Sequence, residues 1–375
     1  MTEAFADRLV ALAVPGVPQD DAAAHDAVVR LVYEQGLLAW AHDVAGARGW
    51  PSALQARLGR ARVEATRRAL AQVALLATLT RRAEAAGAPL LALKGVALSI
   101  ALHGDPARRH AADLDVLVAP RDIGFVVTAL RDLGFTPDAP WQQGSADDFL
   151  RWAPLHHEFV FRDSGGQLVE VHTRLTGPLM GRSRSVDALW QDRLSLSVGG
   201  KAVAMPSLED TAPHLAVHGF CHGWERLAWI GDIAVLATRD DMDWDRARAL
   251  AASLRCRTAL DASLLVAHEL FDTNVPHGVD GRARRAARAV VTRIGRGQLA
   301  PPLAGWLGDH FRSKDGWNDA ARHAWRLWWT PAITDAAPGQ WPPPWLALAW
   351  RRPLRLLAAH VGRRTVSRSR AGTGP

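Results

Sequence analysis

The sequence predicts an α+β fold in which a small strand-containing core lies between helical segments at both ends of the chain. Two apolar runs of strand length, at residues 90–93 and 113–118, bracket a short apolar helical stretch. Two further strands are predicted at 157–162 and 167–175. The link between them, Asp163-Ser-Gly-Gly166, is a hairpin signal. Apolar residues before and after this region recur at helical spacing instead.

The periodicity and its breaks divide the chain into five segments. Helices are predicted within 21–48 and from Pro51 to about Ala86, and the chain is expected to turn helical again from Pro178 onwards. The predicted segments are an N-terminal helical segment (1–87), the core (88–176), a helical bundle packed on the core (177–275), a Trp-rich helical extension (276–340), and a Pro-rich break with an amphipathic segment and a disordered basic tail (341–375).

Composition indicates a globular protein of the cytoplasm. The chain has 375 residues, of which 48% are apolar and 22% charged, enough for two or three packed units. Its two cysteines, Cys221 and Cys256, form no disulfide framework, which fits a reducing compartment. The N-terminus carries Glu3 and Asp7 and lacks the pattern of a secretory signal, and no apolar run reaches membrane-spanning length.

The net charge of +7 is confined to the C-terminus. Residues 336–375 contain seven arginines and no acidic residue, which leaves 38 basic against 38 acidic residues in the rest. Nucleic acid is therefore not expected as a partner. The segment 345–361 combines tryptophans, leucines and arginines, a composition that suits peripheral contact with anionic lipid. A helix packed on the bundle is the favoured interpretation, and Pro353 interrupts any single long helix.

Asp113-Leu-Asp115 is the centre of the predicted chemistry. In a strand, residues i and i+2 point to the same face, so the two carboxylates lie side by side. Two carboxylates that close repel each other unless a cation sits between them. Oxygen ligands on a rigid strand suit Mg²⁺ or Mn²⁺, which share their remaining positions with substrate phosphates. The alternative is an Asp pair on a solvated strand face, since the tripeptide is common.

Lys94-Gly95 precedes the acid pair and is predicted to bind phosphate. Lysine occurs only at Lys94, Lys201 and Lys314 among 45 basic residues, so its use before the glycine suggests that a compact ammonium is wanted there. Gly95 allows a sharp turn into the helix predicted at 96–102, whose first N–H groups face an anion. Chance placement of the lysine is the alternative.

The second strand of the predicted hairpin supplies a third acid. Glu170 and His172 share one face there, while Val169 and Val171 share the other. If the hairpin lies beside the Asp113–Asp115 strand, Glu170 completes the site. Glu158 is the alternative third acid, and a salt bridge from Glu170 to an arginine (Arg174 or Arg109) is the structural alternative.

Histidines recur along a helix predicted to begin at the N-cap Ser207. His214, His218 and His222 stand at i, i+4 and i+8 on one face. The first and third are too far apart for a compact metal site, so a face lining the substrate cleft is favoured over a zinc site.

Four motifs in this order resemble those of the uncharacterised nucleotidyltransferase family of the DNA polymerase β-like superfamily. The resemblance covers roughly Leu31–Pro276. The motifs are Leu93-Lys94-Gly95, Arg109-X-X-X-Asp113-Leu-Asp115-Val-Leu-Val, Val169-Glu170-Val-His172 and His218-X-X-X-His222-Gly-Trp-X-X-Leu-X-Trp-X-X-Asp232.

The resemblance implies a nucleotidyltransferase core, a mixed β-sheet with flanking helices. It further implies transfer of a nucleoside monophosphate from an NTP, with pyrophosphate release and a metal ion (Mg²⁺ or Mn²⁺) held by Asp113 and Asp115. Glu170 would complete the metal site or take the acceptor proton. The other implied roles are phosphate binding at Gly95, charge compensation at Lys94 or Arg109, and support of the ligands or contact with the acceptor at His172 and His218. A small molecule, a peptide or a protein side chain fits as the acceptor.

Two other functions compete with this one. The superfamily usually carries Gly-Gly or Gly-Ser in the first turn, whereas this chain has Lys94-Gly95-Val96. A decayed site that binds a nucleotide or a partner without turnover would show such a departure. A metal-dependent glycosyltransferase also uses Asp-X-Asp, but it normally has a longer run of alternating strands and helices before the acid pair.

Overall fold

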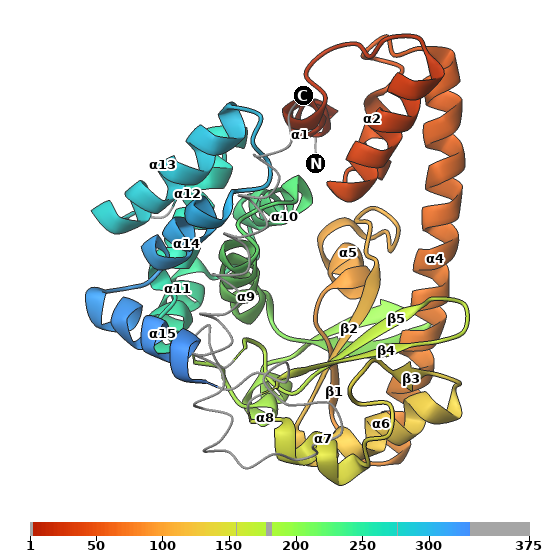
Figure 1. Cartoon of the computed structure of the whole chain (residues 1–375), viewed down its shortest axis with the longest axis vertical. Coiled ribbons are helices and arrows are strands. Elements are labelled where there is room, and N and C mark those ends of the chain that lie inside the picture. Colours follow the sequence, from red (N-terminus) through yellow and green to blue (C-terminus); the bar gives the residue numbers. More distant parts are fainter. Residues whose placement is uncertain (1–2, 155, 178–181, 276, 331–375) are drawn as a thin grey trace, which may run out of the picture.

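The computed structural model describes residues 3–154, 156–177, 182–275 and 277–330. Within these ranges, seven strands form one mixed sheet in the order β3-β4-β5-β2-β1-β7-β6. Helices precede, interrupt and follow the strands (Figure 1). The predicted α+β fold is confirmed. The predictions for 341–375 fall outside the described residues.

None of the helices in the described ranges combines the length and the apolar character needed to cross a membrane.

The first four helices form the N-terminal layer, and the last of them reaches the sheet. They are α1 (Glu3–Ala13), α2 (Ala22–Glu34), α3 (Leu38–Val44) and α4 (Ser52–Ala85). Asp21 caps α2 by accepting a hydrogen bond from the Ala24 N–H. The long helix α4 runs along one side of the molecule (Figure 1). It buries Val73, Leu76 and Leu79 in the core beneath the sheet.

The four predicted strands are present as β1, β2, β4 and β5, and they are neighbours in the sheet around β2. The strands are β1 (Leu90–Ala92), β2 (Asp113–Val118), β3 (Thr136–Pro137), β4 (Glu158–Arg162), β5 (Leu168–His172), β6 (Leu194–Val198) and β7 (Lys201–Met205). Strand β2 pairs antiparallel with β1 and parallel with β5. Strands β4 and β5 form the predicted antiparallel hairpin, and the hairpin lies beside β2.

The two faces of β2 and β5 differ in character. Leu114, Val116, Val169 and Val171 are fully buried in the apolar core beneath the sheet. Residues of three further helices complete this core, namely α5 (Gly95–His103), α6 (Ile123–Asp132, preceded by the 3-10 turn Pro120–Asp122) and α7 (Ala146–Trp152). The opposite face therefore carries the polar residues of both strands.

The prediction of helix throughout the region after Pro178 is wrong. The short helix α8 (Val186–Gln191) is followed by the β6–β7 hairpin, and β7 extends the sheet by pairing parallel with β1. Leu194, Leu196 and Val198 alternate with serines, as in a half-exposed strand. Gly199-Gly200 form the turn with φ of +57° and +76°, a left-handed conformation that glycine adopts without strain.

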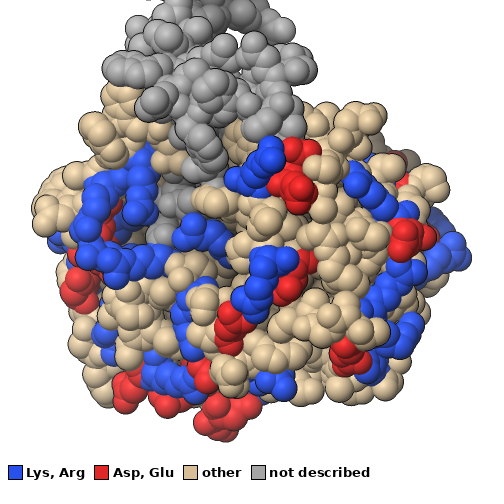
Figure 2. Space-filling model, turned by 90° about the horizontal axis from the view of Figure 1, so that it is seen from below, with Lys and Arg blue, Asp and Glu red and all other residues tan. Residues whose placement is uncertain are grey.

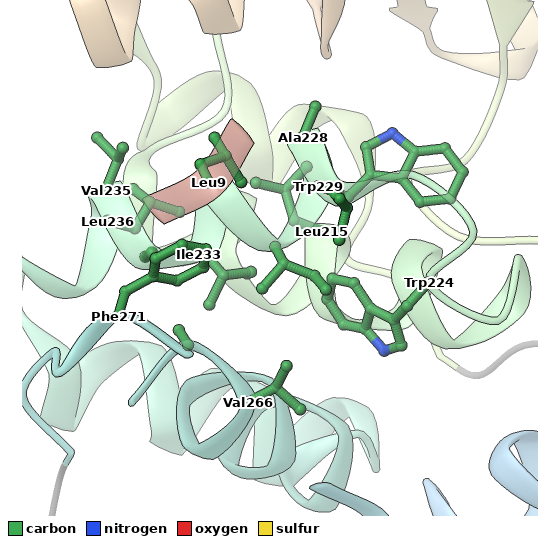
Figure 3. Packing of buried hydrophobic residues seen from close by; sticks show 14 of the residues in the cluster. Leu9, Leu215, Trp224, Ala228, Trp229, Ile233, Val235, Leu236, Val266 and Phe271 are labelled. Atoms are coloured by element: carbon green, nitrogen blue, oxygen red, sulfur yellow. The ribbon is translucent and has the colours of Figure 1, made fainter. Parts of the chain in front are cut away.

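In the described part of the chain, seven helices follow the sheet, and residues of several of them share an apolar cluster with the N-terminal layer. They are α9 (Leu208–Cys221), α10 (Leu227–Ala237), α11 (Trp244–Leu254), α12 (Arg257–Phe271), α13 (Gly281–Gly295), α14 (Leu303–Arg312) and α15 (Trp317–Trp329). The predicted cap is present, since Ser207 accepts a hydrogen bond from the Asp210 N–H. Figure 3 shows Leu9 of α1 in the same apolar cluster as Leu215 of α9 and Ile233 of α10.

Acidic and basic side chains are interspersed on the face seen in Figure 2. This mixture agrees with the balance of 38 basic and 38 acidic residues in 1–335.

Close packing of Trp224 against α9 fixes the end of that helix. The Trp224 N–H donates to the Gly219 carbonyl at 2.8 Å, and the indole is 1% exposed. A Cβ at Gly219 would lie 2.5 Å from the indole ring, which is closer than van der Waals contact allows. The chain reverses beneath α9 only because residue 219 has no side chain.

We predict that Gly219→Ala lowers the free energy of unfolding by about 1–3 kcal/mol, because the added methyl overpacks a rigid site. Gly59→Ala is the matched control within α4, where the new Cβ would meet the His42 ring at an ordinary 3.7 Å. That change should stabilise the protein by about 0.5–1 kcal/mol. Denaturant titration measures both, and equal effects would contradict the packing argument.

Candidate functional site

The β2–β5 register brings the predicted acids together. Asp115 lies directly opposite Glu170 in the parallel pairing of β2 with β5. Asp113, two residues before Asp115 in β2, points to the same face. Across the hairpin, Glu158 lies opposite His172. Four carboxylates therefore lie on one face of the sheet, along a diagonal from Asp113 on β2 through Asp115 and Glu170 to Glu158 on β4.

Lys94 and Gly95 join α5 to this face. Gly95 has a φ of +56°, and a Cβ there would lie 3.2 Å from the Asp113 carbonyl oxygen, so glycine permits both the turn and the close approach. Lys94 is buried, and its Nζ lies 3.0 Å from Asp115 Oδ1. The same oxygen is 3.1 Å from His172 Nε2. Lys94 thus contacts the acid pair directly and precedes the first turn of α5.

The acids differ in their affinity for protons. Burial disfavours the charged form of Asp115, but Lys94 and His172 hold the pKa of its carboxyl below the ordinary value. Burial, reinforced by the Asp115 charge, raises the pKa of Asp113. Burial also raises the pKa of Glu170. Although burial favours a neutral His172 ring, its hydrogen bonds to Asp115 and Glu170 raise its pKa to about 9.

Glu170 lies against His172 rather than an arginine. Glu170 Oε2 is 3.6 Å from His172 Nε2, and within the described ranges neither Arg109 nor Arg174 pairs with it. Burial raises the pKa of Glu158 as well, and its Oε2 lies 3.9 Å from His172 Nδ1. Both glutamates remain within reach of the site, so the choice of Glu170 as the third acid stays a prediction.

The charges of the cluster fit a divalent cation. The four carboxylates (Asp113, Asp115, Glu158 and Glu170) outnumber the two cations that contact them, Lys94 and His172. Arg109, which is paired with Asp232, and Arg226 line the same cavity. Burial is the main cause of the raised pKa values of Asp113, Glu158 and Glu170, and repulsion from neighbouring carboxylates adds to it. Ligand atoms of Asp115, Glu170 and His172 lie within 4.8 Å of one another. Mainly oxygen donors at this spacing suit Mg²⁺ or Mn²⁺.

The acids line a cavity of about 380 Å³, a volume typical of small-molecule sites. Its other wall comes from α9 and α10 and contains His214, His218, His222 and Trp229. The predicted histidine face therefore lines the cavity. Within the described residues, the groups with metal-ligand spacing do not include these three histidines.

Arg109 lines the cavity but is also tied to α10. Its Nε donates to Asp232 Oδ2 at 2.7 Å, and both side chains are buried. The Arg109 N–H also donates to Ser99 Oγ of α5. This ion pair joins two of the motifs, which stand 123 residues apart. The charge of the Arg109 guanidinium also reaches the acids, because it offsets part of the rise in the pKa of Asp113.

The structure adds residues that the sequence does not single out. His157, at the start of β4, lines the cavity together with Glu225 and Arg226, which precede α10. The run His156-His157-Glu158 is a polar cluster just before a predicted strand, and this signal could have identified His157 as a site residue. Glu225 and Arg226 carry no such signal, because their position depends on the turn after α9.

A sequence model of the family described as "Uncharacterised nucleotidyltransferase" matches residues 21–272. No curated protein is significantly similar in sequence. Among solved structures, the chain is similar to the antibiotic-resistance factor ANT(2'')-Ia, with 14% identity, 54% of this chain and 94% of that chain covered, and a TM-score of 0.30. It is also similar to an antigenic nucleotidyltransferase-like protein from Paracoccidioides brasiliensis, with 16% identity, 52% and 91% covered, and a TM-score of 0.30.

We predict that Asp232→Ala lowers the free energy of unfolding by about 3–5 kcal/mol, because it leaves the buried Arg109 guanidinium without its partner. Asp132→Ala removes the acid of the exposed Arg82–Asp132 pair and should cost no more than about 1 kcal/mol. Urea unfolding compares the two. Similar losses for both variants would show that the Arg109–Asp232 contact is not the buried tie described above.

Proposed function

We propose that this chain, which belongs to the uncharacterised nucleotidyltransferase family, transfers a nucleoside monophosphate from an NTP to an acceptor and releases pyrophosphate. The observation that carries the proposal is the row of four carboxylates beside the start of α5, which outnumber the two cations in contact with them and of which Asp115 is buried. A divalent cation supplies positive charge to the carboxylates, and the triphosphate bound with it places anionic oxygens at a helix N-terminus.

Asp113, Asp115 and Glu170 are the proposed ligands of Mg²⁺ or Mn²⁺. When bound, the cation would neutralise charge on the triphosphate and polarise the reacting oxygens. The rigid β2–β5 pairing holds the three carboxylates in place before substrate arrives.

Phosphate binding is assigned to the start of α5. The first N–H groups of an α-helix have no partner within the helix, and the turn at Gly95 starts α5 beside the backbone of Asp113. The Lys94 ammonium contacts Asp115 in the free protein. When substrate binds, it would move from this carboxylate to a phosphate oxygen. Arg109 adds positive charge near the proposed phosphate site, and its hydrogen bond to Asp232 fixes the position of its side chain.

His218 is assigned to substrate contact and His172 to support of the metal ligands. His172, with a pKa of about 9, carries a proton and donates to Asp115, so it orients that carboxylate rather than acting as a base. A small molecule, a peptide or a protein side chain fits as the acceptor.

A second candidate is a protein that binds a nucleotide without turning it over. It is favoured by one observation, that Lys94 and His172 already contact the same oxygen of Asp115. Turnover separates the two candidates.

The test is incubation of the full chain with each labelled NTP, Mg²⁺ and a cell extract, with pyrophosphate release and labelled products as readouts. We expect extract-dependent pyrophosphate release and one labelled product, both abolished by a chelator. Nucleotide binding without either signal would support the second candidate. Absence of NTP binding would overturn both.

We predict that Asp113→Asn and Asp115→Asn each weaken Mg²⁺-dependent NTP binding by more than roughly 100-fold, because even residues that only support metal ligands typically cost 10–100-fold. The Asp113 variant should keep or raise the thermal midpoint of the free protein, because it relieves repulsion from Asp115. Asp147→Asn, an exposed change on α7, is the control. Unchanged Mg²⁺–NTP affinity in both variants would contradict the metal assignment.

We also predict that Glu170→Gln reduces turnover at least tenfold more than Glu158→Gln, since Glu170 is the direct neighbour of Asp115 whereas Glu158 pairs with His172. The two substitutions are chemically identical, which makes each the control of the other. Steady-state pyrophosphate release measures them. The opposite ranking would move the third acid to β4.

A further inference from the structure

The cavity wall formed by α9, α10 and the turn between them carries four aromatic rings. We call His214, His218, His222 and Trp229 the His–Trp wall. The centroid of the His218 ring lies 4.5 Å from that of His222 and 4.7 Å from that of Trp229, where the two planes meet at 78°. His214 stands one turn earlier on α9, 6.2 Å from His218. All four residues line the same cavity as the carboxylates.

The rings of the His–Trp wall carry no net charge. Burial, reinforced by the Lys94 charge, lowers the pKa of His214 to about 3 and that of His218 well below its ordinary value. Burial lowers the pKa of His222 too. Lys94 and the start of α5, the proposed phosphate site, lie at the other wall, and the one guanidinium found over a ring of the His–Trp wall in the described residues is that of Arg226, 5.6 Å from the Trp229 ring centroid. The His–Trp wall therefore suits an uncharged part of a ligand.

His214 also has hydrogen-bonding capacity that the protein does not use. Its side chain is 7% exposed, and neither ring nitrogen has a hydrogen-bond partner within the described part of the chain. Leaving a buried polar group without a partner is costly, so such groups are normally paired. A neutral imidazole offers one donor and one acceptor. A ligand edge that carries both kinds of group would satisfy it.

We propose that the His–Trp wall binds the nucleobase of the NTP. This inference rests on the proposed function and adds the position of the base. A nucleobase is planar and uncharged, and its edge carries donors and acceptors. It can pack against the rings of His218 and Trp229 while its edge meets His214. The triphosphate then extends across the cavity towards Lys94 and the carboxylates.

The test compares NTPs with inorganic tripolyphosphate, which lacks base and sugar. Isothermal titration calorimetry in the presence of Mg²⁺ would measure the affinity of the full chain for ATP, GTP, CTP, UTP and tripolyphosphate. The wild-type protein should bind at least one NTP roughly tenfold or more tightly than tripolyphosphate, since stacking of one base contributes about that much or more. His218→Leu should remove that advantage and leave tripolyphosphate affinity within about twofold.

His103→Leu is the matched control, because His103 packs on Trp40 and does not line the cavity. It should change neither affinity. The wild-type comparison needs no variant, so it decides the question even if His218→Leu does not fold.

Equal wild-type affinity for NTPs and tripolyphosphate would overturn the base assignment while the phosphate site stands. A parallel loss of both ligands in His218→Leu would also overturn it. Failure of the wild-type protein to bind either ligand would overturn the proposed function and the base site together.

Discussion

The structure depends on the pairing of β2 with β5, which holds like charges together at a cost. Asp115 and Glu170 are direct neighbours in the sheet, and Asp113 lies next to them on the same face. Their mutual repulsion would favour separation. The opposite face of the same strands buries Leu114, Val116, Val169 and Val171 completely. Burial of apolar area there, about 25 cal/mol per Å², fixes the register against the repulsion on the polar face.

The segments outside the sheet complete the cavity rather than merely covering it. The Arg109–Asp232 pair ties the loop before β2 to α10, and Gly219 lets Trp224 pack beneath α9. Both contacts determine where the His–Trp wall stands relative to the carboxylates. The four motifs of the sequence are thus parts of one cavity although they come from separate segments.

Much of this arrangement could be predicted from local patterns. Alternation along Asp113–Val118 and Leu168–His172 indicated which side chains share a face, because the period of a strand is two. The sequence-based predictions do not include the β6–β7 hairpin, although Gly199-Gly200 between two alternating runs is a hairpin signal. They treat the whole region after Pro178 as helical and so overlook this short alternating stretch.

Contacts made by long side chains could not be predicted in the same way. The sequence placed Lys94 near phosphate, but its direct contact with Asp115 depends on how α5 turns at Gly95. The partner of Arg109 lies on a helix 123 residues later, and no local pattern encodes that pairing. The choice between Glu158 and Glu170 likewise depends on cross-strand register.

We propose that the carboxylates of β2 and β5 hold a divalent cation together with a triphosphate. The most direct measurement is anomalous diffraction from crystals grown with Mn²⁺ and a non-hydrolysable NTP analogue. We expect a manganese peak within bonding distance of Asp113, Asp115 and Glu170, with the triphosphate directed towards the start of α5. Bound analogue with no manganese at these carboxylates, or manganese at another site alone, would contradict it.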